Sequence, residues 1–120
     1  MNIFLRELTL PYPPVLNTYY RHVRGKILIS KEGREYRAYV KNAIYASKDK
    51  AILFSRLRVE IWATMPDKRR RDLDGIPKAV LDALTHAKVW GDDEQIDELR
   101  IIRGHVEKPG KLLVKIFLAD

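Results

Sequence analysis

The chain has 120 residues, of which 46% are hydrophobic, and this is enough for one domain, residues 1–120, with a modest core. Its 23 lysines and arginines exceed its 16 aspartates and glutamates, and the net charge of +7 favours acidic partners such as nucleic acid. No apolar run approaches the length of a membrane span and the N-terminus lacks a signal-peptide pattern, so we expect a cytoplasmic protein that does not bind membranes. The absence of cysteine excludes disulfides and thiolate metal sites.

The N-terminal half is predicted to form two strands and a helix. Residues 3–10 are rich in strand-forming side chains, and the prolines within residues 11–14 force an extended loop. A short second strand is expected at residues 26–29. Ser30 is a suitable N-cap for a helix that runs to about Ser47. The apolar face of this helix follows spacings of three and four residues and comprises Tyr36, Val40, Ala43 and Ile44.

The second half is predicted to form a strand, a helix and two further strands. Apolar and polar side chains alternate over residues 57–63, as in a half-buried strand. Asp74 is expected to cap a helix over about 75–87, with Pro77 in the first turn, where amides lack intrahelical acceptors. The final strands are expected at 99–106 and 112–118, joined by a turn at 108–110. This order predicts an α+β domain in which two helices pack on a mixed or mostly antiparallel sheet.

A basic run lies directly against two carboxylates after the 57–63 strand. The segment comprises Lys68, Arg69, Arg70 and Arg71, followed by Asp72 and Asp74. Residues i and i+2 of an extended chain point to the same side, so both aspartates are expected to face one ion. Magnesium prefers a few carboxylates and keeps water or phosphate oxygens in its other positions. The segment therefore predicts a Mg²⁺ site, without an organic cofactor, beside a surface that attracts phosphate.

A later acidic segment is expected to complete this site. Either Asp93 or its neighbour Asp92 would supply the third carboxylate, provided that residues 89–90 pack against the sheet and return the chain to the loop. Lys78 follows Asp74 by one helical turn and is expected to face the same phosphate. Since a bound divalent ion activates water and polarises a phosphoryl oxygen, these groups suit phosphodiester hydrolysis.

Each part of this pattern also has a simpler interpretation. An isolated Asp-x-Asp pair is usually a solvated loop or a helix cap. The basic run suits a solvated surface loop, and the acidic residues of 92–98 suit a turn that balances its charge. The loop after the prolines contains Asn17, Tyr19, Tyr20 and Arg21, which suit phosphate contact or base stacking. Its tyrosines suit packing on the core equally well.

The chain resembles the RusA family of Holliday-junction resolvases along nearly its whole length. The residues that carry the resemblance are Pro13-Pro14-x-x-Asn17-x-Tyr19-Tyr20-Arg21-His22, Met65-Pro66-Asp67-x-Arg69-Arg70-Arg71-Asp72-Leu73-Asp74, Lys78, Asp82-Ala83-Leu84-Thr85 and Trp90-x-Asp92-Asp93. The basic run that leads into Asp-Leu-Asp, together with the distant Asp-Asp, is more specific than either piece alone. The chain departs from the family at Gly75, where the family usually has asparagine, and at Pro77.

The resemblance implies a magnesium-dependent endonuclease that acts as a homodimer and nicks two opposed strands of a four-way DNA junction in recombination and repair. It implies that Asp72, Asp74 and Asp93 are metal-binding catalytic carboxylates and that Lys78 is a catalytic cation near the phosphate. The residues expected to bind DNA are Lys68, Arg69, Arg70, Arg71, Asn17 and Arg21.

Two other hypotheses compete with this one. The first is a basic protein that binds branched DNA without cutting it. The second is a nucleotide-sugar transferase that uses Asp-x-Asp with a metal, but the chain is short for that class and has no Gly-rich nucleotide-binding pattern.

Overall fold

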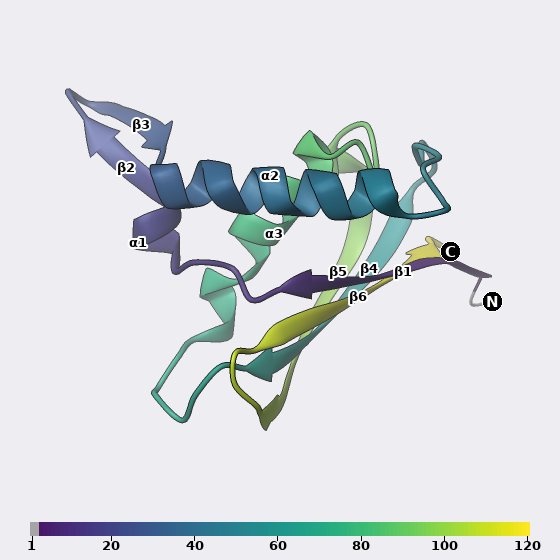
Figure 1. Ribbon diagram of the computed structural model, residues 1–120. Helices are drawn as coiled ribbons and strands as arrows, with labels where there is room; N and C mark the ends of the chain where they lie inside the picture. Colours follow the sequence, from purple (N-terminus) through teal and green to yellow (C-terminus); the bar gives the residue numbers. More distant parts are fainter. Residues whose placement is uncertain (1–2) are drawn as a thin grey trace.

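A four-stranded mixed sheet forms the centre of this computed structural model, which describes residues 3–120 (Figure 1). The side chains of Leu16 and Asn17 lie outside the described part. The sheet contains β1 (Ile3–Pro11), β4 (Leu57–Met65), β5 (Ile96–Val106) and β6 (Lys111–Leu118), in the order β1-β6-β4-β5.

The two C-terminal strands are joined by a turn but are not neighbours in the sheet. β4 pairs in parallel with β5 and antiparallel with β6, while β6 also pairs antiparallel with β1. The turn at residues 108–110 therefore carries the chain past β4. Both parallel and antiparallel pairs are present and two long helices pack on the sheet, so the predicted α+β fold with a mixed sheet is confirmed.

Strand β4 shows the predicted alternation, with one exception. The core side chains are fully buried and comprise Leu57, Val59, Ile61 and Ala63. On the opposite face Glu60 was expected to be exposed, yet it is 8% exposed. Arg58 Nη1 lies 2.5 Å from a carboxylate oxygen of Glu60, and Trp62 Nε1 donates to the other oxygen at 3.3 Å. These neighbours cover the carboxylate and satisfy its oxygens, which is what permits its burial.

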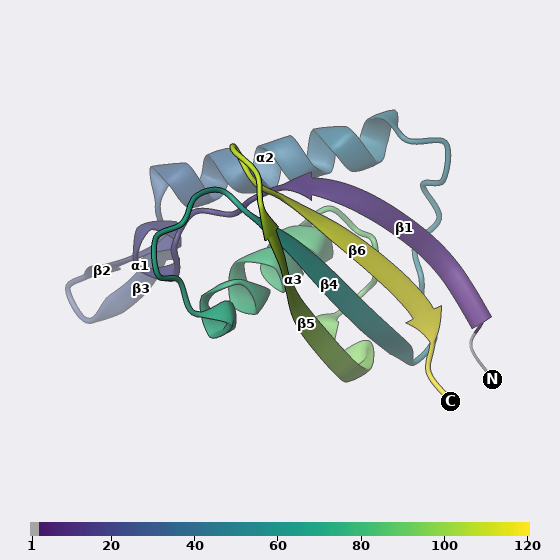
Figure 2. The same ribbon diagram turned by 90° about the horizontal axis from the view of Figure 1, so that it is seen from below.

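Helices α2 (Lys31–Ala46) and α3 (Pro77–His86) cover one face of the sheet and leave the other open (Figure 2). The predicted N-cap of α2 is confirmed, because Ser30 Oγ accepts a hydrogen bond from the Gly33 amide at 3.0 Å. The predicted apolar face of α2 is buried except for Ala43, which is exposed. No helix in the described residues is long and apolar enough to cross a bilayer.

The start of α3 differs from the prediction. Asp74 does not cap the helix but lies within a 3-10 turn, η1 (Leu73–Gly75), closed by a bond from the Ile76 amide to the Leu73 carbonyl at 3.1 Å. Pro77 is the first residue of α3, because its fixed φ suits that position and its missing N–H would have no partner there. The carboxylate of Asp74 is exposed and therefore remains available to other partners.

Two elements between β1 and α2 were missed. A short helix, α1 (Leu16–Tyr19), leads directly into β2 (Tyr20–Val23), which pairs antiparallel with the predicted strand β3 (Lys26–Ile29). The tight turn between them places Arg24 at φ 49° and Gly25 at φ 75°. Residues 20–23 lack the alternation of a half-buried strand, since both faces of this hairpin are largely exposed.

The contact between α2 and the base of this hairpin leads to a stability prediction. A Cβ on Gly33 would lie 2.5 Å from the Tyr19 carbonyl oxygen and 2.7 Å from the Ile29 side chain. We expect Gly33→Ala to lower the free energy of unfolding by about 1–3 kcal/mol in urea denaturation. Gly75→Ala is the control, because a Cβ there meets nothing within 4 Å, and it is expected to gain about 0.4–1 kcal/mol. Equal effects of the two substitutions would contradict this packing.

Candidate active site

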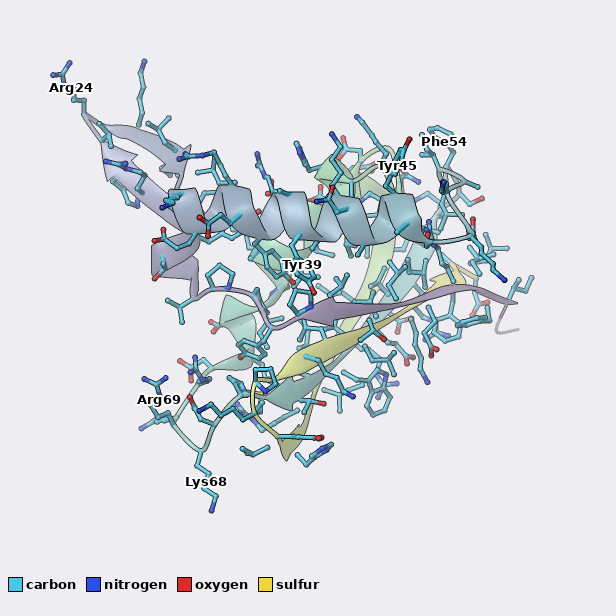
Figure 3. The ribbon with its side chains drawn as sticks, in the orientation of Figure 1. Arg24, Tyr39, Tyr45, Phe54, Lys68 and Arg69 are labelled. Carbon is cyan, nitrogen blue, oxygen red and sulfur yellow. The ribbon has the colours of Figure 1, made fainter. Side chains whose placement is uncertain are left out.

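The basic loop after β4 is partly neutralised by its own aspartate. Asp67 accepts hydrogen bonds from Arg69 Nη2 at 3.0 Å and from Arg71 Nη2 at 2.9 Å. Hydrogen bonds from Arg71 and then Arg69 hold the pKa of the Asp67 carboxyl well below its ordinary value. Arg71 also lies over the Tyr12 ring, 5.7 Å from its centre. Two of the four predicted phosphate-binding cations thus order the loop, while Lys68 points into solvent at its tip (Figure 3).

Asp72 and Asp74 line the same cleft. This cleft has a volume of about 420 Å³ and lies between the loop at residues 12–15 and two segments, 69–72 and 74–76. Both carboxylates belong to exposed residues, and among the described residues neither has a hydrogen-bond or ion-pair partner. The cleft therefore presents two uncommitted oxygen donors beside a basic loop.

The second acidic segment forms a 3-10 turn, η2 (Asp93–Gln95), directly after the buried Trp90. Trp90 is fully buried and donates to Thr85 Oγ1 of α3 at 2.6 Å, and Val89 also belongs to the hydrophobic core. Asp92 caps the turn by accepting a bond from the Glu94 amide at 3.1 Å. This capping occupies one oxygen of Asp92, and Asp93 begins the turn directly beside it.

Gln95 fixes the position of η2 against the sheet. Its Oε1 accepts bonds from the amides of Gly91 and Asp92, each at 2.9 Å. Its Nε2 donates to the carbonyls of Leu53 at 3.0 Å and Ser55 at 2.9 Å. This buried amide was not identified from the sequence, because a single glutamine carries no pattern that distinguishes it from a surface residue.

Lys78 and Asp93 both lie near Tyr20. Lys78 Nζ lies 5.2 Å from the centre of the Tyr20 ring. Burial and then the negative charge of Asp82 raise the pKa of the Tyr20 hydroxyl, and Asp93 adds to this effect. Burial and then the neighbouring Asp92 carboxyl raise the pKa of Asp93 itself. The ionised form of Asp93 is therefore disfavoured where it lies, and a bound cation would stabilise it.

The predicted site residues thus fall into two groups. Asp72 and Asp74 share the cleft, whereas Asp93 and Lys78 approach the ring of Tyr20. Within residues 3–120 no three acidic or histidine side chains gather closely enough to hold a metal ion. Arg21 is exposed on β2, and the side chain of Asn17 lies outside the described residues.

A polar network on α3 was also missed by the sequence analysis. Asp82 accepts hydrogen bonds from Arg37 Nε at 2.7 Å, from Arg37 Nη2 at 2.9 Å and from the Tyr19 hydroxyl at 2.5 Å. Burial raises the pKa of the Asp82 carboxyl, but the bonds from Arg37 and Tyr19 outweigh burial and lower it. The network joins α1, α2 and α3. The only sequence signal for it was the presence of Tyr19 and Asp82 among the family residues.

The fold and the site together define a small α+β protein with a cleft rich in cations and carboxylates at the end of β4. The family model described as Endodeoxyribonuclease RusA matches residues 11–116, and the chain therefore belongs to the RusA family.

Relatives agree with this assignment over most of the chain. A protein of Enterobacteria phage HK97 named crossover junction endodeoxyribonuclease rusA is 46% identical over 110 residues, which cover 92% of each chain. A protein of the same name from Enterobacteria phage 82 is 45% identical, and crossover junction endodeoxyribonuclease RusA of Escherichia coli K12 is 43% identical, with the same coverage.

The Asp82 network leads to a prediction about acid stability. We expect Asp82→Asn to lower the free energy of unfolding by about 1–3 kcal/mol at pH 7, because a carboxylate that accepts charged hydrogen bonds is lost. The folded-state pKa lies below the ordinary 3.8, so this stabilisation is complete above about pH 4 and is lost as the pH falls through the folded-state pKa. The free energies of unfolding of the wild type and the variant in urea should therefore begin to converge below about pH 4 and approach each other as the pH falls further.

The control is Asp97→Asn, which removes a similar contact with Arg56 from an exposed position. Its effect should stay within about 1 kcal/mol at either pH. A difference between wild type and Asp82→Asn that persists unchanged at pH 2 would contradict the assigned pKa shift.

Proposed function

We propose that this chain, as a single domain over residues 1–120, is an endodeoxyribonuclease that cuts four-way junction DNA. The observation that carries the proposal is the cleft in which Asp72 and Asp74 lie beside the basic loop. Membership of the RusA family and the names of the relatives support the junction as substrate. Since its substrate would be intracellular DNA, the protein would act in the cytoplasm during recombination and repair.

We infer that Mg²⁺ is the cofactor and that Asp72, Asp74 and Asp93 would hold it. Asp93 would have to approach the two cleft carboxylates when the ion binds, because no three acidic side chains of residues 3–120 gather closely enough in the structure itself. The donor set fits this ion, because the two cleft carboxylates are hard oxygen ligands with no other partner among the described residues. The raised pKa of Asp93 supports its inclusion, since uncompensated negative charge favours a cation. When bound, the ion would supply an activated water and stabilise the leaving oxygen.

The cations of the chain would bind and orient the phosphate. Lys78 would approach the scissile phosphate from the first turn of α3, with its ammonium group held over Tyr20. Lys68 and Arg70 are exposed and would contact flanking phosphates. Arg69 and Arg71 hold the loop in place through their hydrogen bonds to Asp67. When DNA binds, some of these bonds would be replaced by bonds to phosphate oxygens.

A homodimer would supply the two active sites that paired symmetric nicks require, because a two-fold axis presents the same surface twice. The open face of the sheet supports this arrangement. No helix of residues 3–120 covers it (Figure 2), and its exposed or partly exposed aromatic side chains include Phe4 and Trp62. Sedimentation equilibrium is expected to give twice the mass of the chain, and a monomer at concentrations that cut junctions would contradict the dimer.

The main prediction concerns Asp72→Asn. Removal of one metal ligand and one negative charge is expected to lower the rate of junction cleavage by at least about 100-fold while junction binding is retained or tightened. Cleavage of a labelled four-way junction in Mg²⁺ and gel-shift binding in EDTA measure the two effects. EDTA should abolish cleavage by the wild type, and a linear duplex and single strands should remain intact.

Glu32→Gln is the matched control, because it removes one exposed negative charge from the first turn of α2, which does not line the cleft. It should cut at the wild-type rate. Cleavage by Asp72→Asn at the wild-type rate would show that the assigned site is wrong. Junction binding by the wild type without any cutting would instead favour the alternative function, a non-catalytic branched-DNA-binding protein.

A further inference from the structure

The β2–β3 hairpin projects from the body of the protein as a separate two-stranded sheet. Figure 1 shows it extending beyond the N-terminal end of α2, and Figure 3 shows Arg24 at its tip. Its register pairs Arg21 with Leu28, His22 with Ile27 and Val23 with Lys26, and it shares no pairing with the main sheet. A two-stranded ribbon of this kind has the dimensions that the major groove of B-DNA accepts.

The hairpin carries only positive charge. Residues 20–29 contain Arg21, Arg24 and Lys26 and no aspartate or glutamate. All three cations are exposed, and none has an ion pair among the described residues. They differ in this respect from Arg69 and Arg71, which already pair with Asp67. The hairpin cations are therefore free to pair with an anion, whereas Arg69 and Arg71 would first have to give up their ion pairs with Asp67.

The base of the hairpin is held rigidly. The Ser30 amide donates to the Tyr19 carbonyl at 2.8 Å, and Ser30 Oγ donates to the same carbonyl at 2.9 Å. The Tyr20 ring packs edge-on against the buried Tyr19 ring, with 4.7 Å between centres. The orientation of the ribbon is therefore set before binding, which lowers the entropic cost of engaging a ligand.

The outer part of the hairpin also exposes apolar surface. Ile27 is 61% exposed and Leu28 is 46% exposed, and they lie on opposite faces of the ribbon. Leu28 shares its face with Arg21, so that face combines a cation with an apolar side chain. This combination suits a groove, where phosphates line the edges and sugar and base edges form the floor.

We propose that the β2–β3 hairpin is a second DNA-binding element, in which Arg24 and Lys26 contact the phosphates of a duplex arm whose groove receives the ribbon. The proposal rests on the proposed function, because it takes DNA as the substrate. Figure 3 shows Arg24 of the hairpin at the upper left of the molecule and the loop with Lys68 and Arg69 at the lower left, so both elements project from the same side.

The test compares two variants that lose the same charge. Arg24→Asn with Lys26→Gln removes two hairpin cations, and asparagine tolerates the positive φ at position 24 and precedes Gly25 as in a favoured hairpin turn. Lys48→Gln with Lys50→Gln removes two exposed cations beyond the opposite end of α2, whose 16 residues span about 24 Å. Binding to a labelled four-way junction is measured in EDTA over a range of KCl concentrations.

We expect the hairpin variant to reduce the slope of log Kd against log salt by about 2 for each protomer that binds, and to weaken binding about tenfold or more near 0.1 M salt. The control variant should bind as the wild type does. Equal affinity and equal slope for the two variants would overturn the proposal. A hairpin variant that sediments as a monomer, with no change in salt slope, would also overturn it and assign the hairpin to contact between protomers.

Failure of the proposed function has a different signature. The wild type would then bind the junction but leave it intact in Mg²⁺, whatever the hairpin variant does. Equal melting temperatures of the wild type and both variants establish that loss of binding is not loss of folding. If the double hairpin variant melts early, Lys26→Gln alone should still reduce the slope by about 1 for each protomer that binds, and an unchanged slope would overturn the proposal.

Discussion

The hydrogen bonds to Asp82 are the interaction on which the arrangement of this protein depends most. One carboxylate holds Tyr19 at the end of α1, Arg37 on α2 and the middle of α3 together. The orientation of α3 in turn sets where Lys78 lies, and the placement of Tyr19 sets where the hairpin begins. The catalytic and DNA-binding groups proposed for this chain are therefore linked through one partly buried ion pair, that of Arg37 with Asp82. Apolar packing also holds the helices together, but it is non-directional and fixes their orientation less closely.

The positive charge of the chain serves two purposes that its composition does not separate. Arg69 and Arg71 form ion pairs with Asp67 and so keep the loop next to the cleft in one conformation. Lys68, Arg70 and the hairpin cations are exposed and available to a polyanion. A pairing of this kind holds the loop in place on its own. If the proposed function is right, DNA phosphates would replace Asp67 as acceptor, because charge-assisted bonds to carboxylate and to phosphate are similar in kind.

The two halves of the candidate site are positioned by different parts of the fold. Asp72 and Asp74 follow the end of β4 and face a cleft whose other wall comes from the proline-rich loop. Asp93 follows the buried Trp90, and Gln95 ties its turn to residues before β4. Helix α3 lies between these halves in the chain, so how it packs on the sheet decides where Asp93 lies relative to the cleft.

The sequence by itself determined the strand pattern of β4, the Ser30 cap of α2, the α+β class and the family, because each depends on local periodicity or on an ordered set of residues. It did not reveal the burial of Glu60, the hairpin partner β2 or the position of β4 between β5 and β6. Proline at position 77, rather than the capping side chain of Asp74, decided where α3 begins. Only the tertiary structure decided that Asp82 meets Arg37 and Tyr19, which lie 45 and 63 residues away. Contacts over such separations depend on how the helices pack, which no local pattern specifies.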